Sequence, residues 1–218
     1  MTKKTQELLK QVAKNTMFVP TTTRTIEQYK RIQLGIQEPK YALVCNGGVL
    51  LIDGEKDQRW YQESLAFIKD TRNVLEQAIL FLENEESRTL EVRFIEELFV
   101  FTKCSRAEEV VEKLKHHLNS REVDVFHHGV KVYVVPKALS KGKMVKRFKE
   151  YIGASIMIAA GDSEFDVSML KEADVSFAPE SLAQQYTLEE NTKVISDSLI
   201  FSEEVLKNIE QYCKKMNY

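Results

Sequence analysis

The chain has 218 residues, of which 43% are hydrophobic and 29% are charged, with a formal net charge of -2. This composition is typical of a globular protein with one large or two small domains, and its charge gives no bulk attraction to nucleic acid or anionic membranes. No apolar run approaches the ~20 residues of a membrane span. The first residues lack the apolar core of a secretory signal. We therefore predict a cytoplasmic protein that binds neither nucleic acid nor membrane.

The three cysteines, Cys45, Cys104 and Cys213, are far apart in the sequence and odd in number. Such a pattern favours free thiols over a disulfide framework or a cysteine-based metal site.

The N-terminal segment predicts a helix, a strand and a second helix. The first helix begins near Thr5 and has one apolar edge, and the run "TMFVP" (16–20) follows it as a short strand. Thr25 and Gln28 have the spacing of a capping box, which predicts a helix start at this point.

Two apolar runs then predict a hairpin. "YALVC" (41–45) and "GVLLI" (48–52) have the length of strands, and Asn46 and Gly47 between them suit a tight turn.

The middle of the chain, residues 55–135, has the pattern of an α+β insert. Paired strands are predicted around the turn at His128 and Gly129, and the other predicted elements are helix 57–86, strands 90–94 and 97–104, and helix 106–118.

After Pro136, helices and apolar strands alternate, which is typical of a parallel sheet covered on both faces. The predicted elements are helix 140–151, strand 155–160, helix 163–172, strand 174–178 and a helix from Ser202. We predict an α/β fold in which residues 1–54 and 136–218 form a Rossmann-like core and residues 55–135 form an inserted domain.

The stretch "IMIAAGDSEFD" (156–166) places Asp162 and Asp166 one helical turn apart, directly after a predicted strand. In an open parallel sheet, ligands bind beyond the carboxyl ends of the strands, and two nearby carboxylates favour a hard cation such as Mg²⁺. The alternative is that Asp162 or Ser163 caps the following helix. Taken alone, the two explanations carry equal weight.

Two further segments carry groups that bind phosphate. Lys141 lies in the first turn of a helix capped by Ser140, where a lysine is disfavoured by the helix dipole unless an anion is near. The other explanation is a solvated surface lysine. "FVPTTTRT" (18–25) ends a strand in threonines and Arg24, which can hold a phosphate oxygen or merely finish the strand and cap a helix.

In this order the three segments resemble the haloacid dehalogenase superfamily, in particular its phosphatases with a type-two α/β cap, which include sugar-phosphate and sucrose-phosphate phosphatases. Thr22, two residues before Arg24, is similar to the family's second motif, Lys141 in "SKG" to the third, and Asp162 and Asp166 in "GDSEFD" to the fourth. "CNGG" (45–48) resembles the Asn-Gly segment that follows the second motif in this class.

The resemblance implies a Mg²⁺-dependent phosphatase that acts on a small phosphorylated metabolite, with sugar phosphates as the substrate class. Thr22 would donate a hydrogen bond to the phosphoryl group, Lys141 would balance its charge, and Asp162 with Asp166 would bind Mg²⁺. Thr23, Arg24, Asn46 and Gly47 would contact the substrate. Residues 55–135 would form the cap that closes over the site.

The family's first motif, a strand ending in Asp-x-Asp, supplies the nucleophile, and the chain contains no Asp-x-Asp. Without it the covalent step lacks an attacking atom, and the central strand of the sheet is missing. We therefore expect an inactive chain with unpaired sheet edges that favour a homo-oligomer. Three explanations are open: a start assigned too late or a shortened chain, which we favour, a degenerate relative, or a strand donated by another chain.

The competing hypothesis from a different class is a non-catalytic protein that binds phosphorylated ligands or acts as a scaffold on the same fold. A receiver-like signalling domain fits the acidic pair but leaves the insert unexplained. The adjacent pairs His116-His117 and His127-His128 do not point the same way on a helix or a strand, so neither forms a preorganised metal chelate.

Overall fold

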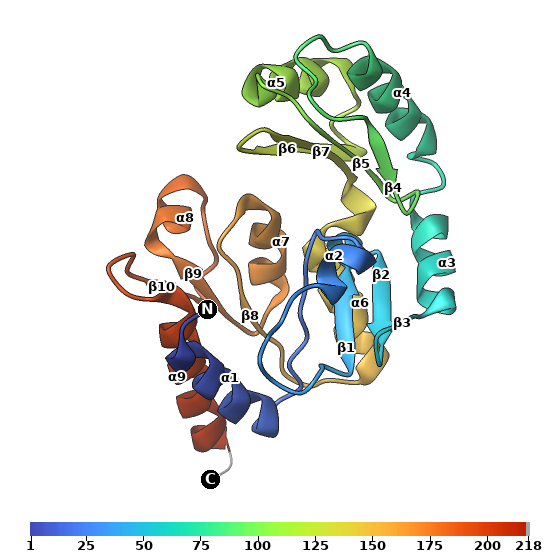
Figure 1. The fold of residues 1–218 in the computed structure, drawn as a ribbon. Helices are drawn as coiled ribbons and strands as arrows, with labels where there is room; N and C mark the ends of the chain where they lie inside the picture. The colour runs from blue at the N-terminus through green and yellow to red at the C-terminus, as the bar shows by residue number, and fades with distance from the viewer. Residues whose placement is uncertain (217–218) are drawn as a thin grey trace.

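The computed structural model describes residues 1–216. Its N-terminal part contains three α-helices and a small antiparallel sheet with the order β1-β2-β3 (Figure 1). The elements are α1 (Lys3–Asn15), α2 (Ile26–Lys30), β1 (Tyr41–Val44), β2 (Val49–Ile52), β3 (Glu55–Lys56) and α3 (Gln58–Phe67).

The predicted hairpin is confirmed, with Val44 opposite Val49 and the turn at Cys45–Gly47. The capping box is confirmed as well, because Thr25 accepts from the Gln28 N–H and Gln28 accepts from the Thr25 N–H.

The middle of the chain forms a four-stranded antiparallel sheet, which we call the cap sheet, in the order β4-β5-β7-β6. Helices α4 and α5 cover its outer face, and the opposite face is turned toward the rest of the molecule (Figure 1). The cap sheet and its helices comprise α4 (Arg72–Glu83), β4 (Arg93–Ile95), β5 (Phe99–Lys103), α5 (Ala107–His117), β6 (Val123–His128) and β7 (Lys131–Pro136).

The C-terminal part is a parallel sheet in the order β10-β9-β8, as expected from its apolar strands. Its elements are α6 (Lys141–Ile152), β8 (Ile158–Ala160), α7 (Glu164–Glu172), β9 (Val175–Pro179), α8 (Glu180–Gln185), β10 (Thr192–Ile195) and α9 (Phe201–Met216). The sequence pattern did not indicate α8 or β10, because α8 is short and β10 contains two exposed residues out of four.

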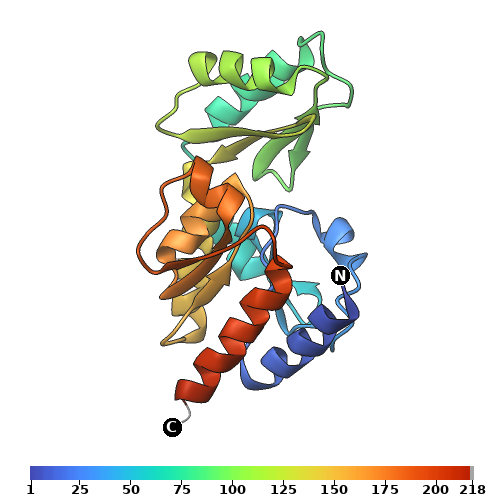
Figure 2. The ribbon, with the colours of Figure 1, turned by 90° about the vertical axis from the view of Figure 1, so that its left-hand side faces the viewer.

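The two ends of the chain pack together through α1 and α9, which lie side by side at the bottom of the molecule (Figures 1 and 2). Thr2 donates to Glu203 over 2.6 Å between Oγ1 and Oε1, and the hydroxyls of Thr5 and Ser202 are 3.1 Å apart. Of the described residues, no helix combines the length and the apolar character that crossing a membrane requires.

The predicted strand 16–20 is wrong as a strand. This segment makes only an isolated parallel bridge, from Thr21 to Leu43, in which Leu43 N–H donates to Pro20 and Thr22 N–H donates to Leu43. There are two physical reasons. No strand of the described residues lies along the other edge of this segment to extend the hydrogen-bond ladder, and Pro20 has no N–H to donate.

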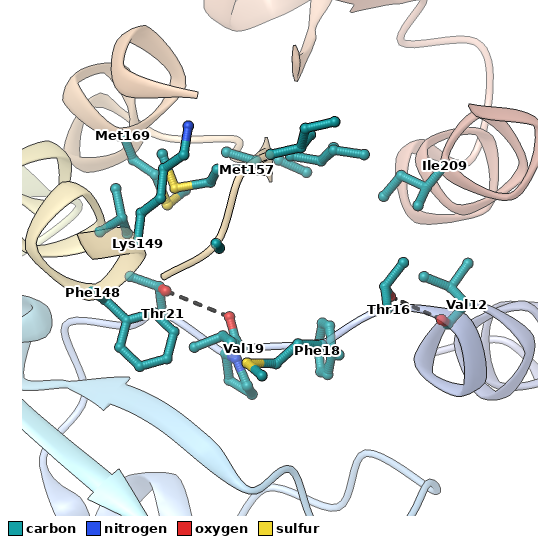
Figure 3. Close-up of a pocket in the computed structure, with 18 of the residues that line it drawn as sticks. Val12, Thr16, Phe18, Val19, Thr21, Phe148, Lys149, Met157, Met169 and Ile209 are labelled. Carbon is teal, nitrogen blue, oxygen red and sulfur yellow. Dashed lines mark hydrogen bonds between the residues drawn. The ribbon is translucent and has the colours of Figure 1, made fainter. Parts of the chain in front are cut away.

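A cavity of about 570 Å³ lies between this segment and β8. Figure 3 shows Phe18 and Val19 on one side, Met157 on the opposite side, and Val12 and Ile209 of the terminal helices at one end. Thr21 and Ala160 also line it. Among the described residues β8 pairs with β9 alone, so its other edge faces this cavity unpaired.

Candidate active site

Lys141 and Asp166 form a buried ion pair at the end of the parallel sheet. The distance between Lys141 Nζ and Asp166 Oδ1 is 2.5 Å, and the two residues are 6% and 5% exposed. Ser140 caps α6 by accepting from the Lys143 N–H, as the sequence predicted. Lys141 is therefore not a solvated surface lysine, because its charge is compensated inside the protein.

The second oxygen of Asp166 organises the loop that carries Asp162. Asp166 Oδ2 accepts from Asp162 N–H and Ser163 N–H, both at 3.2 Å, and from Ser163 Oγ at 2.8 Å. Ser163 and Asp166 thus form a capping box at the start of α7. Both carboxylate oxygens of Asp166 are engaged by protein donors, whereas Asp162 is exposed.

Two glycines allow these segments to approach each other. A Cβ at Gly161 would lie against the Asp166 side chain, and a Cβ at Gly142 would lie against the Ser168 carbonyl oxygen. Gly142 N–H also donates to Ser168 Oγ at 3.0 Å. The glycine of "SKG" therefore permits the close packing of α6 on α7, which brings Lys141 to Asp166.

Asn46 connects the threonine segment to the start of α6. Its backbone N–H donates to the Thr22 carbonyl at 2.9 Å, and its Nδ2 donates to the Leu139 carbonyl at 2.6 Å. Asn46 adopts φ +61°, a left-handed conformation that asparagine tolerates better than most residues. Hydrogen bonds thus link Thr22, Asn46 and Leu139, and two residues after Leu139 the ion pair links Lys141 to Asp166.

The threonine segment presents a hydroxyl and a guanidinium. Thr22 Oγ1 accepts from Arg24 N–H at 3.2 Å, which leaves its own O–H free to donate. Arg24 is exposed, and among residues 1–216 no carboxylate forms an ion pair with it. Thr23 is half-buried beside them.

Gly47 lies in the packed interior. Its carbonyl accepts from Trp60 Nε1 at 3.0 Å, and a Cβ at Gly47 would meet Met144 of α6. Asn46 is also buried, with 3% exposure, and its Oδ1 has no partner in the protein. The substrate contacts predicted for Asn46 and Gly47 stay predictions.

The described residues contain no group of three or more His, Cys, Asp or Glu side chains that could hold a metal ion. Mg²⁺, however, binds proteins through one or two carboxylates and completes its shell with waters and substrate phosphate. Asp162 fits the first of these roles, because its carboxylate is exposed at the end of β8. Asp166 fits less well, since Lys141 already balances its charge.

Aromatic side chains of the cap sheet reach down to the same loop. Phe165, the residue before Asp166, lies with its ring centroid 4.6 Å from that of Phe126 and 5.0 Å from that of Tyr133. Burial raises the pKa of the Tyr133 phenol, and the positive charge of Arg24 opposes this rise. These aromatic residues were not among the site residues predicted from the sequence. The only signal was the position of Phe165 inside "GDSEFD".

Comparisons with known proteins agree with this architecture. The solved structure of the sucrose-phosphatase from Synechocystis, in complex with sucrose and phosphate, superposes with a TM-score of 0.71 at 17% identity, covering 95% of this chain and 91% of that chain. A Thermoplasma acidophilum protein gives 0.64 at 15% identity, covering 97% and 90%. A phosphatase from Bacteroides thetaiotaomicron gives 0.61 at 16% identity, covering 96% and 88%.

At these identities the structural matches show a shared fold, an α/β core with a cap domain. A comparison with curated protein sequences gives no match. The sequence profile of the haloacid dehalogenase-like hydrolases matches residues 55–199, which is more than half of the chain. This chain therefore belongs to the haloacid dehalogenase-like hydrolases.

Proposed function

We propose that this chain forms the phosphate-binding part of a Mg²⁺-dependent phosphatase site for small phosphorylated metabolites, with sugar phosphates as the substrate class. The observation that carries the proposal is the linked set Thr22, Asn46, Lys141, Asp166 and Asp162, held together by hydrogen bonds, one of them from Asn46 to Leu139 just before Lys141, and by one ion pair. The sucrose and phosphate bound in the Synechocystis neighbour support the substrate class.

Each group has a specific task in this proposal. Thr22 O–H and the unpaired Arg24 guanidinium bind phosphoryl oxygens, and the buried Lys141, held by Asp166, adds a positive charge to the site. Asp166 holds Lys141 and the backbone of Asp162 in position rather than contacting the phosphate. Phosphoryl transfer depends mainly on positioning and charge neutralisation, which these groups supply.

Mg²⁺ would be held by the exposed carboxylate of Asp162, with Asp166 next to it in the same loop. When bound, the ion neutralises negative charge on the phosphoryl oxygens. Thr22, Arg24 and Lys141 act on the phosphate directly in this proposal, whereas Asn46 and Asp166 position them.

Turnover requires an attacking carboxylate, and Asp-x-Asp occurs nowhere in the 218 residues. Asp166 is no substitute, because both of its oxygens accept hydrogen bonds. We therefore propose that this chain by itself binds phosphate monoesters without hydrolysing them. This binding role on the same fold is also the second candidate function.

The remaining assignments belong to the same proposal. We assign residues 1–54 and 136–218 to the core and residues 55–135 to the cap. Within the cap range, β3 and α3 connect the two domains, because both contact the core: β3 pairs with β2, and Glu63 of α3 forms an ion pair with Arg147 of α6. We also propose a cytoplasmic location and a homo-oligomer formed through the free edge of β8.

Isothermal titration calorimetry with inorganic phosphate, in the presence and absence of Mg²⁺, tests the binding role. We expect phosphate binding that Mg²⁺ strengthens and that Arg24→Gln weakens by about tenfold. Arg106→Gln, which changes an exposed arginine at the start of α5, is the matched control. Equal phosphate affinity of the wild type and Arg24→Gln would contradict the proposal. Release of phosphate from glucose 6-phosphate by the purified chain would instead establish turnover.

A further inference from the structure

The turn between β4 and β5, residues 95–98, has an unusual backbone for its sequence. Its two central residues, Glu96 and Glu97, have φ of +48° and +54°, and the Leu98 N–H donates to the Ile95 carbonyl at 2.8 Å. Turns with positive φ at both central positions prefer Asn-Gly or Asp-Gly, because other side chains are disfavoured in this conformation. Backbone strain of this kind persists only where the surrounding contacts impose it. The contacts of the two glutamates should therefore explain this turn.

Glu96 joins the cap sheet to the elements that connect the two domains. Its carboxylate forms an ion pair with Lys56 of β3, with 2.7 Å between Oε2 and Nζ, and the Lys56 and Glu96 side chains are 21% and 25% exposed. Its carbonyl accepts from the Tyr61 hydroxyl of α3 at 3.1 Å. The Lys56 ammonium also lies 3.3 Å from the centre of the Tyr61 ring. One residue of the turn thus contacts both connecting elements, β3 and α3.

The surface that receives the turn is anchored to the core. Trp60 of α3 is buried and donates from Nε1 to the Gly47 carbonyl at 3.0 Å. Arg147 of α6 donates to the Trp60 carbonyl at 3.1 Å. Leu98, the last residue of the turn, is fully buried, and its Cδ1 lies 2.7 Å from where a Cβ of Gly48 would be. The β4–β5 turn is therefore packed on elements whose position is set by the core.

The cap sheet contacts the core at its other edge as well. Phe126 of β6 packs on Phe165 of α7, with 4.6 Å between the ring centroids. The sheet order places β4 and β6 at opposite edges. Figure 1 shows β4 next to α3 and β6 above α7. The cap is thus held at two separate places, by an aromatic contact at one edge and by a turn with an ion pair at the other.

We propose that the β4–β5 turn is a latch that holds the cap sheet in this position over the core, with the Lys56–Glu96 ion pair as its releasable part. The strained backbone presents the Glu96 carboxylate to Lys56 and the Glu97 carboxylate to Arg72 of α4, with 2.9 Å between Oε2 and Nη1. The latch sets where the cap lies and does not act on phosphate. Its action goes beyond the proposed function and can be measured on the chain without a ligand.

Hydrogen–deuterium exchange and small-angle X-ray scattering of the full chain test the latch. In Lys56→Met we expect the backbone amides of residues 94–100 to exchange about tenfold faster, because a hydrogen bond between charged groups no longer opposes opening. The radius of gyration should rise as the cap moves away from the core. Glu91→Gln breaks an exposed ion pair with Arg93 that stays within the cap, so this matched control should change neither quantity.

A second variant separates a latch from an ordinary turn. Asn and Gly at positions 96 and 97 suit the positive φ values, so the double variant Glu96→Asn, Glu97→Gly relieves the backbone strain. It also removes both carboxylates of the latch. We expect a larger radius of gyration, as in Lys56→Met, despite the more favourable turn sequence. An ordinary turn would become more stable in this variant, and the radius of gyration would stay as in the wild type, which would overturn the latch.

Trp60 shows whether the rest of the molecule is intact. It is the one tryptophan of the 218 residues, and its emission reports the packing of α3 on the core. An unchanged emission in Lys56→Met, together with faster exchange and a larger radius, supports the latch. Unchanged exchange and radius would overturn it, and so would a red-shifted emission, because α3 would then have left the core. Phosphate binding is measured separately by calorimetry, so neither failure affects the proposed function.

Discussion

Lys141 and Asp166 are 25 residues apart in the sequence and form an ion pair 2.5 Å long between the starts of α6 and α7. This ion pair fixes the positions of both side chains. Asp166 also accepts a hydrogen bond from the Asp162 N–H, so the ion pair helps to position the backbone of Asp162 as well. Burying two charges costs solvation energy, which offsets much of their mutual attraction. The main effect of this ion pair is therefore to position the site residues rather than to stabilise the fold.

Removing one partner of this pair should be costly. Lys141→Met leaves the Asp166 charge buried without compensation, so we expect a loss of about 3 kcal/mol in the free energy of unfolding, measured by urea titration. The double variant Lys141→Met, Asp166→Asn should be more stable than Lys141→Met alone, because the uncompensated charge is gone. Lys115→Met, at an exposed pair with Glu112, should change stability by about 0.5 kcal/mol or less. A double variant less stable than the single one would contradict this account.

Asp162→Asn should abolish Mg²⁺ binding without loss of stability. The side chain is exposed and forms no ion pair among residues 1–216, so its carboxylate is available to a cation. Calorimetric titration with MgCl₂ measures the effect, and Asp70→Asn, at an exposed aspartate between α3 and α4, is the control. Unchanged Mg²⁺ affinity in Asp162→Asn would refute the metal assignment.

Gly142→Ala should separate α6 from α7. The new methyl group would lie against the backbone carbonyl of Ser168, which cannot rotate away as a side chain can. We expect a loss of about 2 kcal/mol in the free energy of unfolding. Gly48→Ala should cost less, since the Cβ there meets the end of the flexible Leu98 side chain. Equal losses in the two variants would argue against tight packing at Gly142.

Cys45 should be unreactive in the folded protein. Burial raises the pKa of its thiol to about 12, so the thiol stays protonated at pH 8, whereas Cys213 is half-buried. Ellman's reagent should therefore modify Cys213 first and reach Cys45 only on unfolding. In the unfolded chain the Cys45 thiol ionises at about pH 8.5, so the unfolded state loses this proton at a lower pH than the folded state does. The free energy of unfolding should therefore fall as the pH rises from about 8.5 toward 12. Rapid labelling of Cys45 in native protein would contradict its burial.

Association through β8 can be tested at Ala160. Gly161 N–H bonds to Phe177 of β9, so by the alternation of a parallel strand the Ala160 N–H faces the cavity. Ala160→Pro removes this donor and should shift any oligomer to monomer in sedimentation experiments. Ala160→Val, which keeps the N–H, is the control. Loss of the oligomer in both variants would indicate a different interface.

Local sequence patterns were sufficient to predict several helix caps and strands of this protein. The capping box of Thr25 and Gln28, the Ser140 cap, the hairpin of β1 and β2 and the parallel strands β8 and β9 depend on residues close in sequence, and all were predicted. The order of the motif residues was also sufficient to indicate the family, which the profile match confirmed.

Only the tertiary structure decided the relationships that span the chain. The sequence could not show that Asp166 forms an ion pair with Lys141. Nor could it show that Asn46 forms hydrogen bonds with both Thr22 and Leu139, or that Lys103 and Lys131 are paired on neighbouring strands. These contacts depend on strand register and on how closely helices pack, which many distant residues determine together. The predicted strand 16–20 failed for the same reason, because a strand needs partners that its own residues cannot specify.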